Sequence, residues 1–547
     1  MGLRNFMMLT IIVVIALVAV ACGNGGAYPE PENIAEAPTI PEIPVETPAE
    51  NPSEDIAENR EAVVWLTAAE SAALDPIVQN DQLTADLTAQ IFEGLMWYGP
   101  GNVLEPQLAE SYEIIDDANL VYQFNLRSGV TFHDGTPFTA EAVKISIDRL
   151  LDPDNASPGA SILEMINEVV VVDDYTVQII LQYPFSPFTA HLTHMVGSIH
   201  SPASIAEGTT NEHPIGTGPF MFEYRVSGDY TRMIPNPNHW RKTPVHDLIF
   251  RVIPDPAIRL AMIDDGEAHA FAGLASHIYD LNNMPHVDWW RIPQASLTYI
   301  GFNTDPDTRD GARDEMTAQA LADPRVRRAI TMAINATEIL YDIQKGEGVL
   351  AVGPIRGGLV THAPIDVPGL AFDPDAAREL LAEAGFPEGF SLSIWTNEGD
   401  TIRASICGLV QANLAVIGIE LDVHTIEGAV YLNDTAAGLH DMFLMDWVTT
   451  TGDADYGILP LFHSNGIGGT NRTHYTSLTI DRLLEEARMS VDPVVRDDLY
   501  RQITEILVYD APMIFLFHPD IPVVTNGIDG MIFDFTVAPY FFDVTLR

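Results

Sequence analysis

The stretch LVYQFNLRSGVTFHDGTPFTAEAVKISIDRL, residues 120–150, carries the clearest structural pattern in the chain. Apolar and polar side chains alternate over its first seven residues, as in a strand with one buried face. The apolar positions of this pattern are Leu120, Tyr122, Phe124 and Leu126. The sequence therefore predicts a half-buried β-strand at residues 120–126.

The second part of the same stretch has the residues of a turn followed by a helix. Asp134-Gly135 predicts a tight turn, and Thr139 is placed to cap a helix that begins near Ala140. Glu141 falls in the first helical turn, where a negative charge is favourable. Turn and cap chemistry account for these residue types, so we interpret residues 132–143 as scaffold, with ligand contact as the alternative.

The flanking segments extend the pattern in both directions. Val63–Leu66 predicts a short buried strand, and the Asp75-Pro76 turn precedes apolar residues at helical spacing. Those residues are Leu87, Ile91, Phe92 and Leu95. Val169–Val172 and Tyr175–Leu181 predict the two strands of a hairpin, so the region between residues 98 and 215 is expected to be β-rich.

A strand, a helix and a second strand follow one another between residues 248 and 272. The strand Leu248–Val252 is followed by Asp255 as helix N-cap with Pro256 at the first helical position. Gly266 ends the helix, and His269–Ala272 is the second strand. This order predicts a parallel pairing with a right-handed crossover.

The same order returns later in the chain, which predicts a second α/β lobe. The expected strands are Leu392–Trp395, Ile419–Thr425 and Phe443–Trp447, with a helix at residues 402–417 between the first two. Further helices are expected at residues 373–385, 480–488 and 493–509.

The first 60 residues have a different character. Residues 6–21 form an uncharged apolar run that spans about 24 Å as a helix, short for a bilayer core of about 30 Å, and Cys22 follows directly. This favours a signal peptide over a membrane anchor. Residues 23–60 are rich in Pro and Glu, with nine acidic residues against one arginine, and predict an extended tether.

Composition excludes several classes of protein. The chain has 547 residues, a net charge of -50 and 47% hydrophobic residues, so it is large enough for several domains and is not a nucleic-acid binder. Two cysteines, Cys22 and Cys407, cannot build a disulfide framework or a cysteine-rich metal site. Cys407 lies among apolar residues and is expected to pack in the core.

Enzyme signatures are missing from the sequence. There is no nucleophile elbow, P-loop or H-E-x-x-H helix, and residues 466–469 lack the spacing of a dinucleotide fingerprint. The histidines are scattered, and we do not expect His133, His191, His194 or His463 to bind a metal. We therefore predict no catalytic residues, no cofactor and no metal site.

Several further segments, taken in order with residues 120–150, resemble one known family. They are LDP at 74–76, IFEGL at 91–95, IGTGPF at 215–220, IGFNT at 300–304, DPRVRRAITMAIN at 323–335 and DPDAARELLAEAGFPEG at 373–389. Together they are similar to the solute-binding proteins of peptide/nickel ABC transporters, bacterial extracellular solute-binding protein family 5. The similarity covers essentially all of residues 61–547. Residues 19–23, AVACG, resemble a lipobox, in which Cys22 is lipidated.

The resemblance implies an α/β fold of the two-lobed periplasmic-binding-protein type, in its extended peptide-binder class. Residues 1–22 would be the lipoprotein signal peptide and residues 23–60 the tether. Lobe I would take residues 61–296 and 518–547, with a β-rich subdomain inserted at 98–215, and lobe II residues 297–517. Crossover strands are expected near Leu297–Asn303 and Met513–Pro519, and hinge closure would enclose the ligand.

The resemblance also implies where a ligand is held. By position, the lobe I segment that lines the cleft is Asn80, Asp81 and Gln82, and the lobe II segment is residues 447–455, WVTTTGDAD. From the second segment we expect Trp447, Thr449, Thr450 and Asp453 to contact the ligand. Trp395 could stack on a ligand, and Arg472 could bind its carboxylate. The alternatives are core packing for the tryptophans and an ion pair for Arg472.

One position departs from the pattern of relatives that bind peptides. Those proteins place an aspartate three residues after the tryptophan to bind the ligand's α-ammonium, whereas this chain has Thr450. A hydroxyl cannot provide that charge, so Asp453 or Asp455 would have to replace it from a shifted loop, or serve as a turn residue instead. A sugar oligomer, a metal chelate or a modified peptide therefore becomes a possible ligand.

The function that the resemblance implies is capture of a solute outside the cytoplasm. We expect a monomeric protein, anchored to the cell membrane through lipidated Cys22, that binds a peptide or similar oligomer and delivers it to an ABC permease and ATPase. It would catalyse no reaction. The alternatives are a surface signalling or adhesion receptor on the same scaffold and, in a different class, a secreted hydrolase that uses paired carboxylates.

Overall fold

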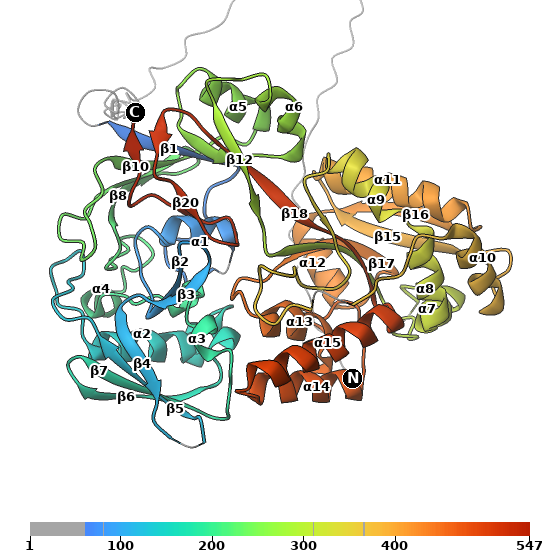
Figure 1. Cartoon of the computed structure of the whole chain (residues 1–547), viewed down its shortest axis with the longest axis horizontal. Coiled ribbons are helices and arrows are strands. Elements are labelled where there is room, and N and C mark those ends of the chain that lie inside the picture. The colour runs from blue at the N-terminus through green and yellow to red at the C-terminus, as the bar shows by residue number, and fades with distance from the viewer. Residues whose placement is uncertain (1–60, 80, 117, 310, 365–366) are drawn as a thin grey trace, which may run out of the picture. The chain divides into compact units, whose positions relative to one another are not determined.

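One long strand joins the two halves of the main sheet. The computed structural model describes residues 61–79, 81–116, 118–309, 311–364 and 367–547. In it, β18 (Met513–Thr525) pairs antiparallel through its first half with β13 (Ser296–Phe302). Through its second half it pairs with β11 (Ala270–Ala272) and β12 (Asp288–Pro293). Because β12 leads directly into β13, the chain crosses between the halves at two adjacent places (Figure 1).

Lobe I is built on the half of the sheet that contains β11. Its strands lie in the order β8-β9-β10-β1-β11, and the C-terminal residues add two short strand pairs. The strands are β1 (Ala62–Thr67), β8 (Phe220–Val226), β9 (Tyr230–Pro235), β10 (Asp247–Val252), β19 (Ile528–Asp529), β20 (Ile532–Phe533), β21 (Pro539–Tyr540) and β22 (Thr545–Leu546). Helices α5 (Pro256–Asp264) and α6 (Ile278–Leu281) also belong to this lobe.

The two strands of the strand-helix-strand unit in lobe I are parallel, as predicted, but they do not pair with each other. Asp255 caps α5 through the backbone N–H of Ala257, at 2.8 Å. Strands β10 and β11 are both parallel to β1, which lies between them. The apolar side chains of β1, including Val63 and Trp65, are buried, so this N-terminal strand completes the core between the two predicted strands.

A β-rich subdomain extends lobe I. Its antiparallel sheet has the order β4-β5-β7-β6, with β4 (Ala109–Ile114), β5 (Val121–Leu126), β6 (Ile166–Asp173) and β7 (Thr176–Leu181). The predicted hairpin is confirmed as β6 and β7, and the strand predicted at 120–126 is confirmed as β5. Around it lie α2 (Ala140–Leu151), α3 (Phe188–His191), α4 (Pro202–Glu207) and the pair β2 (Met96–Gly99) and β3 (Val103–Pro106).

The turn predicted within residues 132–139 is present. Gly135 has φ +82°, and Asp134 accepts a hydrogen bond from the backbone N–H of Thr136 at 2.8 Å. Thr139 holds the N-cap position of α2, as predicted, but its side chain makes no cap hydrogen bond. The scaffold interpretation of this motif therefore rests on the turn rather than on a capping hydroxyl.

The helix predicted from the spacing of Leu87 to Leu95 is shorter than expected. Helix α1 (Gln82–Thr88) ends before Ile91, whose carbonyl accepts a hydrogen bond from the N–H of Gly218 at 2.9 Å. A Cβ atom at Gly216 or Gly218 would lie 2.2 or 2.6 Å from that carbonyl oxygen, so both positions require glycine. The motifs IFEGL and IGTGPF thus form one packed contact.

Lobe II has the sheet order β16-β15-β17-β13. Strands β15 (Ser391–Asn397) and β16 (Glu420–Ile426) are parallel and joined through α11 (Thr401–Ala415), as predicted, and β17 (Met442–Val448) follows. The remaining elements are α7 (Glu315–Ala322), α8 (Pro324–Ala333), α9 (Ala336–Glu338), β14 (Gly348–Leu350), α10 (Pro374–Glu383), α12 (Gly428–Ala436), α13 (Ala454–Phe462), α14 (Leu478–Met489) and α15 (Pro493–Asp510).

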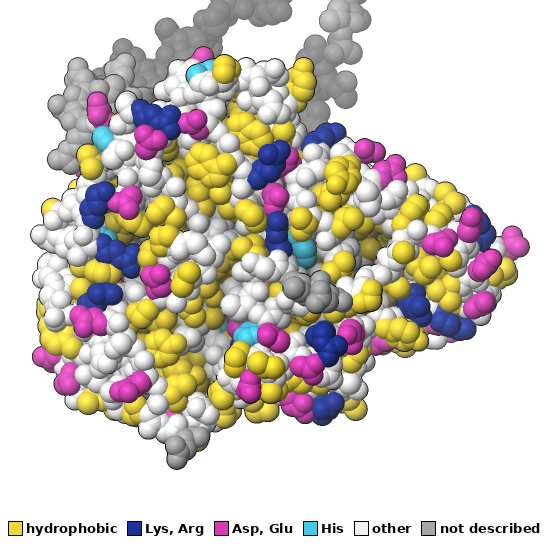
Figure 2. Space-filling model, viewed as in Figure 1, with side chains coloured by type: hydrophobic (Ala, Val, Ile, Leu, Met, Phe, Trp, Pro, Cys, Tyr) yellow, Lys and Arg dark blue, Asp and Glu magenta, His cyan; other side chains and the backbone are white. Residues whose placement is uncertain are grey.

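The surface carries both signs of charge. Acidic and basic side chains are interspersed on the face that Figure 2 shows, which gives no large patch of one sign there. None of the described helices is long and apolar enough to cross a bilayer. The predicted signal peptide, Cys22, the tether and Asn80 lie outside the described residues.

Candidate functional site

A cavity lies where lobe I meets a loop of lobe II. Lobe I lines it with the start of α1, with β2 and with residues 193–198 and 534–540, while lobe II contributes Thr450. Three of the predicted ligand residues, Asp81, Gln82 and Thr450, therefore line one cavity. The segments at 81–82 and 450 are far apart in the sequence, and the fold brings them together.

The start of α1 holds its polar side chains in place by local hydrogen bonds. Asp81 caps the helix and accepts hydrogen bonds from the backbone N–H of Thr84 at 3.0 Å and from its hydroxyl at 2.7 Å. Gln82 donates through Nε2 to Asp86, at 2.7 Å. Helix geometry therefore fixes both predicted residues at the edge of the cavity.

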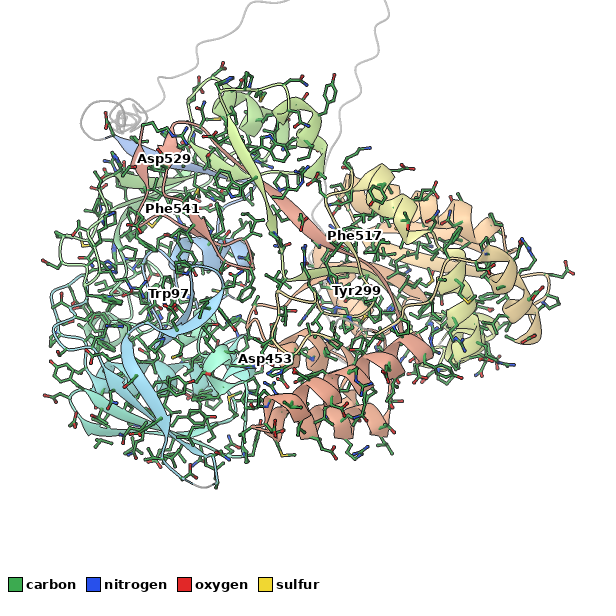
Figure 3. All side chains as sticks on the ribbon, in the orientation of Figure 1. Trp97, Tyr299, Asp453, Phe517, Asp529 and Phe541 are labelled. Atoms are coloured by element: carbon green, nitrogen blue, oxygen red, sulfur yellow. The ribbon has the colours of Figure 1, made fainter. Side chains whose placement is uncertain are left out.

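Aromatic side chains, among them Trp97 and Tyr540, form another wall, and Arg241 packs on Trp97 without lining the cavity. The guanidinium carbon of Arg241 lies 4.0 Å from the ring centroid of Trp97 and 4.5 Å from that of Trp240. Trp97, labelled in Figure 3, also meets Tyr540 edge to face at 5.8 Å between centroids. Burial lowers the pKa of Arg241, which remains a cation stacked between two indole rings.

A direct contact joins the lobes beside the cavity. The hydroxyl of Tyr98, on β2, donates a hydrogen bond of 2.7 Å to the carbonyl of Thr451. The Tyr98 ring meets Phe535 edge to face at 4.6 Å between centroids. The loop after β17 therefore rests on lobe I in this structure, directly next to Thr450.

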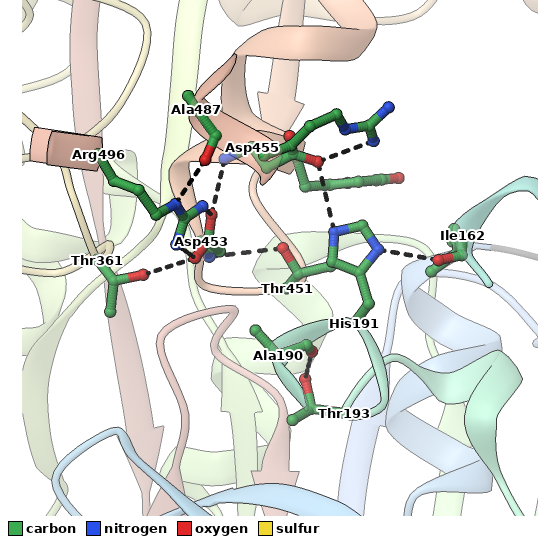
Figure 4. A network of polar contacts seen from close by, with 12 residues as sticks. Ile162, Ala190, His191, Thr193, Thr361, Thr451, Asp453, Asp455, Ala487 and Arg496 are labelled. Carbon is green, nitrogen blue, oxygen red and sulfur yellow. Dashed lines mark hydrogen bonds and ion pairs between the residues drawn. The ribbon is translucent and has the colours of Figure 1, made fainter. Parts of the chain in front are cut away.

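Asp453 makes a buried ion pair instead of facing the cavity. Its carboxylate binds both terminal nitrogens of Arg496, at 2.7 and 3.0 Å, and the side chain is 4% exposed (Figure 4). Burial raises the pKa of Asp453, but the charge and hydrogen bonds of Arg496 and the backbone N–H of Asp455 together lower it below its ordinary value. Both oxygens of Asp453 are therefore bonded to Arg496 in this structure, and Asp453 does not line the cavity, so its contact with a ligand stays a prediction.

Asp455, the other predicted substitute, is also occupied. One of its oxygens lies 3.2 Å from Arg488 and 3.7 Å from Nε2 of His191, on the subdomain of lobe I (Figure 4). Nδ1 of His191 donates to the carbonyl of Ile162 at 2.9 Å, and burial lowers the pKa of this imidazole. This group is thus a second contact between the lobes.

The other predicted site residues do not line this cavity. Trp447 donates through Nε1 to the carbonyl of Tyr456 at 3.0 Å, and Trp395 lies 6.1 Å from the ring of His440, so each packs within lobe II. Thr449 is 3% exposed. Arg472 donates to the carbonyl of Gly469 at 2.8 Å, and among the described residues no carboxylate pairs with it.

The sequence interpretation missed the acids on the lobe I side. Asp534 lines the cavity from the segment between β20 and β21, and Asp86 lies directly behind Gln82. Burial, reinforced by the nearby Asp534 and Asp81, raises the pKa of Asp86 to about 8, and burial also raises the pKa of Asp534. No motif marks either residue, because the two come together only through the fold.

Comparison with known proteins places the chain in a family. The sequence profile of the bacterial extracellular solute-binding proteins, family 5, matches residues 103–469. The chain belongs to this family. Glutathione-binding protein GsiB of Pectobacterium atrosepticum is 28% identical over 459 residues, covering 81% of this chain and 86% of that protein.

Solved structures agree with the family assignment. HbpA2 from Haemophilus parasuis has a TM-score of 0.77 and 28% identity, covering 89% of this chain and all of that one. DppA from Helicobacter pylori, in complex with the peptide STSA, has a TM-score of 0.76 and 27% identity, covering 89% of this chain and 98% of that one. The predicted two-lobed α/β fold is confirmed.

The family also fixes the general role of this protein. Its members are substrate-binding proteins of ABC transporters and not enzymes, so the chain is an extracytoplasmic solute-binding protein of that transporter class. The hydrolase and the signalling receptor receive no support from the comparisons. Within the described ranges, no group of three His, Cys, Asp or Glu side chains could hold a metal ion.

Proposed function

We propose that this protein is a lipid-anchored receptor that captures a peptide or similar oligomer between its lobes and delivers it to an ABC permease. The observation that carries the proposal is the cavity lined by both Thr450 of lobe II and the start of α1 in lobe I. A solute in this cavity would contact both lobes at once. Closure around it would then report occupancy to the membrane partner.

The arrangement of the chain supports hinge closure. The lobes are linked through β18 and through the passage from β12 to β13, and their other contacts beside the cavity are a few polar and aromatic pairs. Residues 61–296 and 518–547 would move as lobe I, with the subdomain at 98–215, against residues 297–517 as lobe II. The short connections between β12 and β13 and within β18 are where rotation would occur.

The ligand class is proposed from the relatives and from the polar lining. GsiB is named for glutathione, and the DppA structure contains a tetrapeptide. A cavity with carboxylates, an indole N–H and a neutral hydroxyl suits a short peptide or a γ-linked peptide such as glutathione. Asp81, Gln82 and Thr450 would contact this ligand. Asn80, Trp395, Trp447, Thr449 and Arg472 would have to act at more distant parts of a longer one.

Binding is tested on the full chain by calorimetry and native mass spectrometry. The probes are glutathione, Ser-Thr-Ser-Ala and a library of three- to five-residue peptides, with maltotriose as a non-peptide control. We expect at least one peptide to bind, to raise the melting temperature and to reduce the radius of gyration in solution scattering. Binding of maltotriose but of no peptide would contradict the proposed ligand class.

The anchor is tested separately. Cleavage before Cys22 would remove residues 1–21 and leave Cys22 as the lipidated N-terminus, and residues 23–60 would hold the lobes away from the membrane. Expression in a bacterial host should give a membrane-bound protein whose N-terminal peptide carries a diacylglyceryl mass. The Cys22→Ser variant should be released or retain its signal peptide, and an unmodified wild-type N-terminus would contradict lipidation.

A further inference from the structure

Two carboxylates that line the cavity and a third behind them have no cationic partner among the described side chains. Asp81 and Asp534 line it, Asp86 lies behind Gln82, and among the described residues none of the three forms an ion pair with Lys, Arg or His. Most other buried acids of the described residues pair with an arginine, whereas Glu93, which also lines the cavity, lies 3.4 Å from Nε2 of His239. The acids with an arginine are Asp75, Asp247, Glu347, Asp441, Asp455 and Asp453, paired with Arg149, Arg232, Arg291, Arg313, Arg488 and Arg496.

Hydrogen bonds fix Asp534 but leave one of its oxygens largely open. Oδ1 accepts from the N–H and hydroxyl of Thr536, at 2.7 and 2.6 Å, and from the N–H of Ala538 at 3.1 Å. Oδ2 accepts only from the hydroxyl of Tyr540, at 3.3 Å. A rigidly held carboxylate with one weakly bonded oxygen is suited to take a further donor.

Two unused donors lie in the same cavity. His194 is 6% exposed, and its Nδ1 accepts from the N–H of Val196 at 3.3 Å, so the neutral imidazole carries its proton on Nε2. Burial lowers the pKa of His194 to about 3, which keeps it neutral. Within the described part of the chain the buried indole N–H of Trp97 has no acceptor, and His194, which lines the same cavity, has its Nε2–H free for a ligand. The Trp97 donor leaves a hydrogen bond unmade unless a ligand supplies oxygen, and the His194 donor could bind the same ligand.

Lobe II brings no positive charge to this place, since its contribution to the cavity is the neutral Thr450. The missing partner must therefore carry both a cation and an acceptor oxygen. A primary ammonium two bonds from a carbonyl, as at a peptide amino terminus, matches a carboxylate that faces two neutral donors across one cavity.

We propose that Asp534, supported by Asp86 and Asp81, binds the ammonium group of the ligand, and that His194 and Trp97 donate hydrogen bonds to the adjacent carbonyl. This inference rests on the proposed function and names the end of the solute that lobe I recognises. It assigns binding of the ligand's ammonium group to lobe I, through residues that no sequence motif marks.

The protonation states support the assignment. Burial and the charges of Asp534 and Asp81 raise the pKa of Asp86 to about 8. Burial, Asp534 and Asp86 also raise the pKa of Tyr540, whereas Arg241 acts in the opposite direction. An ammonium ion placed among these carboxylates would favour their charged forms. Binding at pH 7 should therefore release protons to the buffer.

The test uses the full chain and a library of three- to five-residue peptides without Lys or Arg. Each peptide is present as an equal mixture of its free and its N-acetylated form. Retained peptides are identified by mass spectrometry after rapid gel filtration. We expect wild type to enrich free amines over acetylated forms at least tenfold, and Asp534→Asn to reduce this preference at least fivefold. Asp255→Asn, at the exposed N-cap of α5, should keep the preference.

Each outcome decides between the two proposals. Equal retention of both forms by wild type, or full preference in Asp534→Asn, would overturn the assignment while leaving peptide binding intact. Retention of no peptide at all contradicts the proposed function, and the assignment falls with it. As a second measurement, calorimetry with the most enriched peptide in two buffers of different ionisation enthalpy should show that binding releases protons. The Asp86→Asn variant should release fewer protons. Melting curves confirm that each variant folds.

Discussion

Gly452 of lobe II lies so close to Tyr98 of lobe I that a Cβ atom at this glycine would approach the tyrosine hydroxyl oxygen to 2.6 Å. The same Cβ would lie 2.8 Å from the ring of Phe535, which packs edge to face on Tyr98. Gly452 also has φ +64°. Glycine at this position thus permits the contact that joins the lobes beside the cavity.

Replacing this glycine should oppose closure. We expect Gly452→Ala to weaken peptide binding at least tenfold and to increase the radius of gyration of the ligand-bound protein, because the two aromatic rings are packed on each other and cannot both move aside. Gly468→Ala is the matched control, since its φ is +85° but a Cβ there meets nothing within 4 Å. Equal affinity of both variants would show that the contact does not limit closure.

The hydroxyl of Tyr98 should contribute to the same equilibrium. Tyr98→Phe leaves the buried carbonyl of Thr451 without its 2.7 Å hydrogen bond, which costs about 1–2 kcal/mol in the closed state, or roughly tenfold in ligand affinity. Tyr475→Phe removes a hydroxyl that bonds to Asp510 within lobe II, so it should lower stability without changing affinity. Calorimetry and thermal melting of both variants separate the two effects, and an unchanged affinity in Tyr98→Phe would refute this role.

The ion pair between Asp453 and Arg496 should stabilise lobe II. Arg496→Met leaves a buried carboxylate unpaired, and we expect the free energy of unfolding to fall by about 3–5 kcal/mol. Adding Asp453→Asn should restore part of the loss. Urea denaturation measures these changes, and Arg482→Met, which breaks an exposed pair with Glu486, should alter stability by less than about 1 kcal/mol.

The same pair predicts a pH dependence. Because the folded state lowers the pKa of Asp453 below 3.8, its stabilising contribution is present above pH 3.8 and is lost as pH falls through the folded value. Wild type should therefore lose more stability between pH 5 and pH 3 than the double variant. Parallel pH profiles would indicate that the pair contributes little.

Local chemistry made much of the fold predictable. The Asp255-Pro256 signal located α5 to the residue, and the alternation around Asp173-Asp174 located a hairpin, since caps, turns and side-chain period act over a few residues. The order of the strands in the sheet was harder to predict from the sequence. Insertion of β1 between β10 and β11 depends on contacts between distant segments, which no local pattern records.

The site was predictable only in part for the same reason. Position along the chain located Asp81, Gln82 and Thr450 at the cavity, because the resemblance carries whole segments. It did not reveal the ion pair of Asp453, since the sequence shows a carboxylate but not the arginine that binds it. Asp86 and Asp534 were missed altogether, because each is unremarkable until the fold buries both near one another.

The unligated protein should become less stable as the pH rises toward 8. Burial and the neighbouring Asp534 and Asp81 raise the pKa of Asp86 from 3.8 to about 8, so folding takes up a proton between these values. The favourable contribution is complete below pH 3.8 and is lost as pH rises through about 8. Asp86→Asn should remove most of this slope and raise the stability at pH 8.5 by about 1–3 kcal/mol, because an amide carries no charge to bury.

Urea denaturation of the ligand-free protein at pH 5.5, 7.0 and 8.5, at constant ionic strength, measures the slope directly. Asp255→Asn, which changes an exposed carboxylate of the same lobe, should keep the wild-type profile. A saturating peptide with a free amino terminus should abolish the difference between wild type and Asp86→Asn at pH 8.5, since the ammonium then neutralises the buried acids. If Asp86→Asn retains the full slope, the destabilising charge must lie elsewhere in lobe I or lobe II.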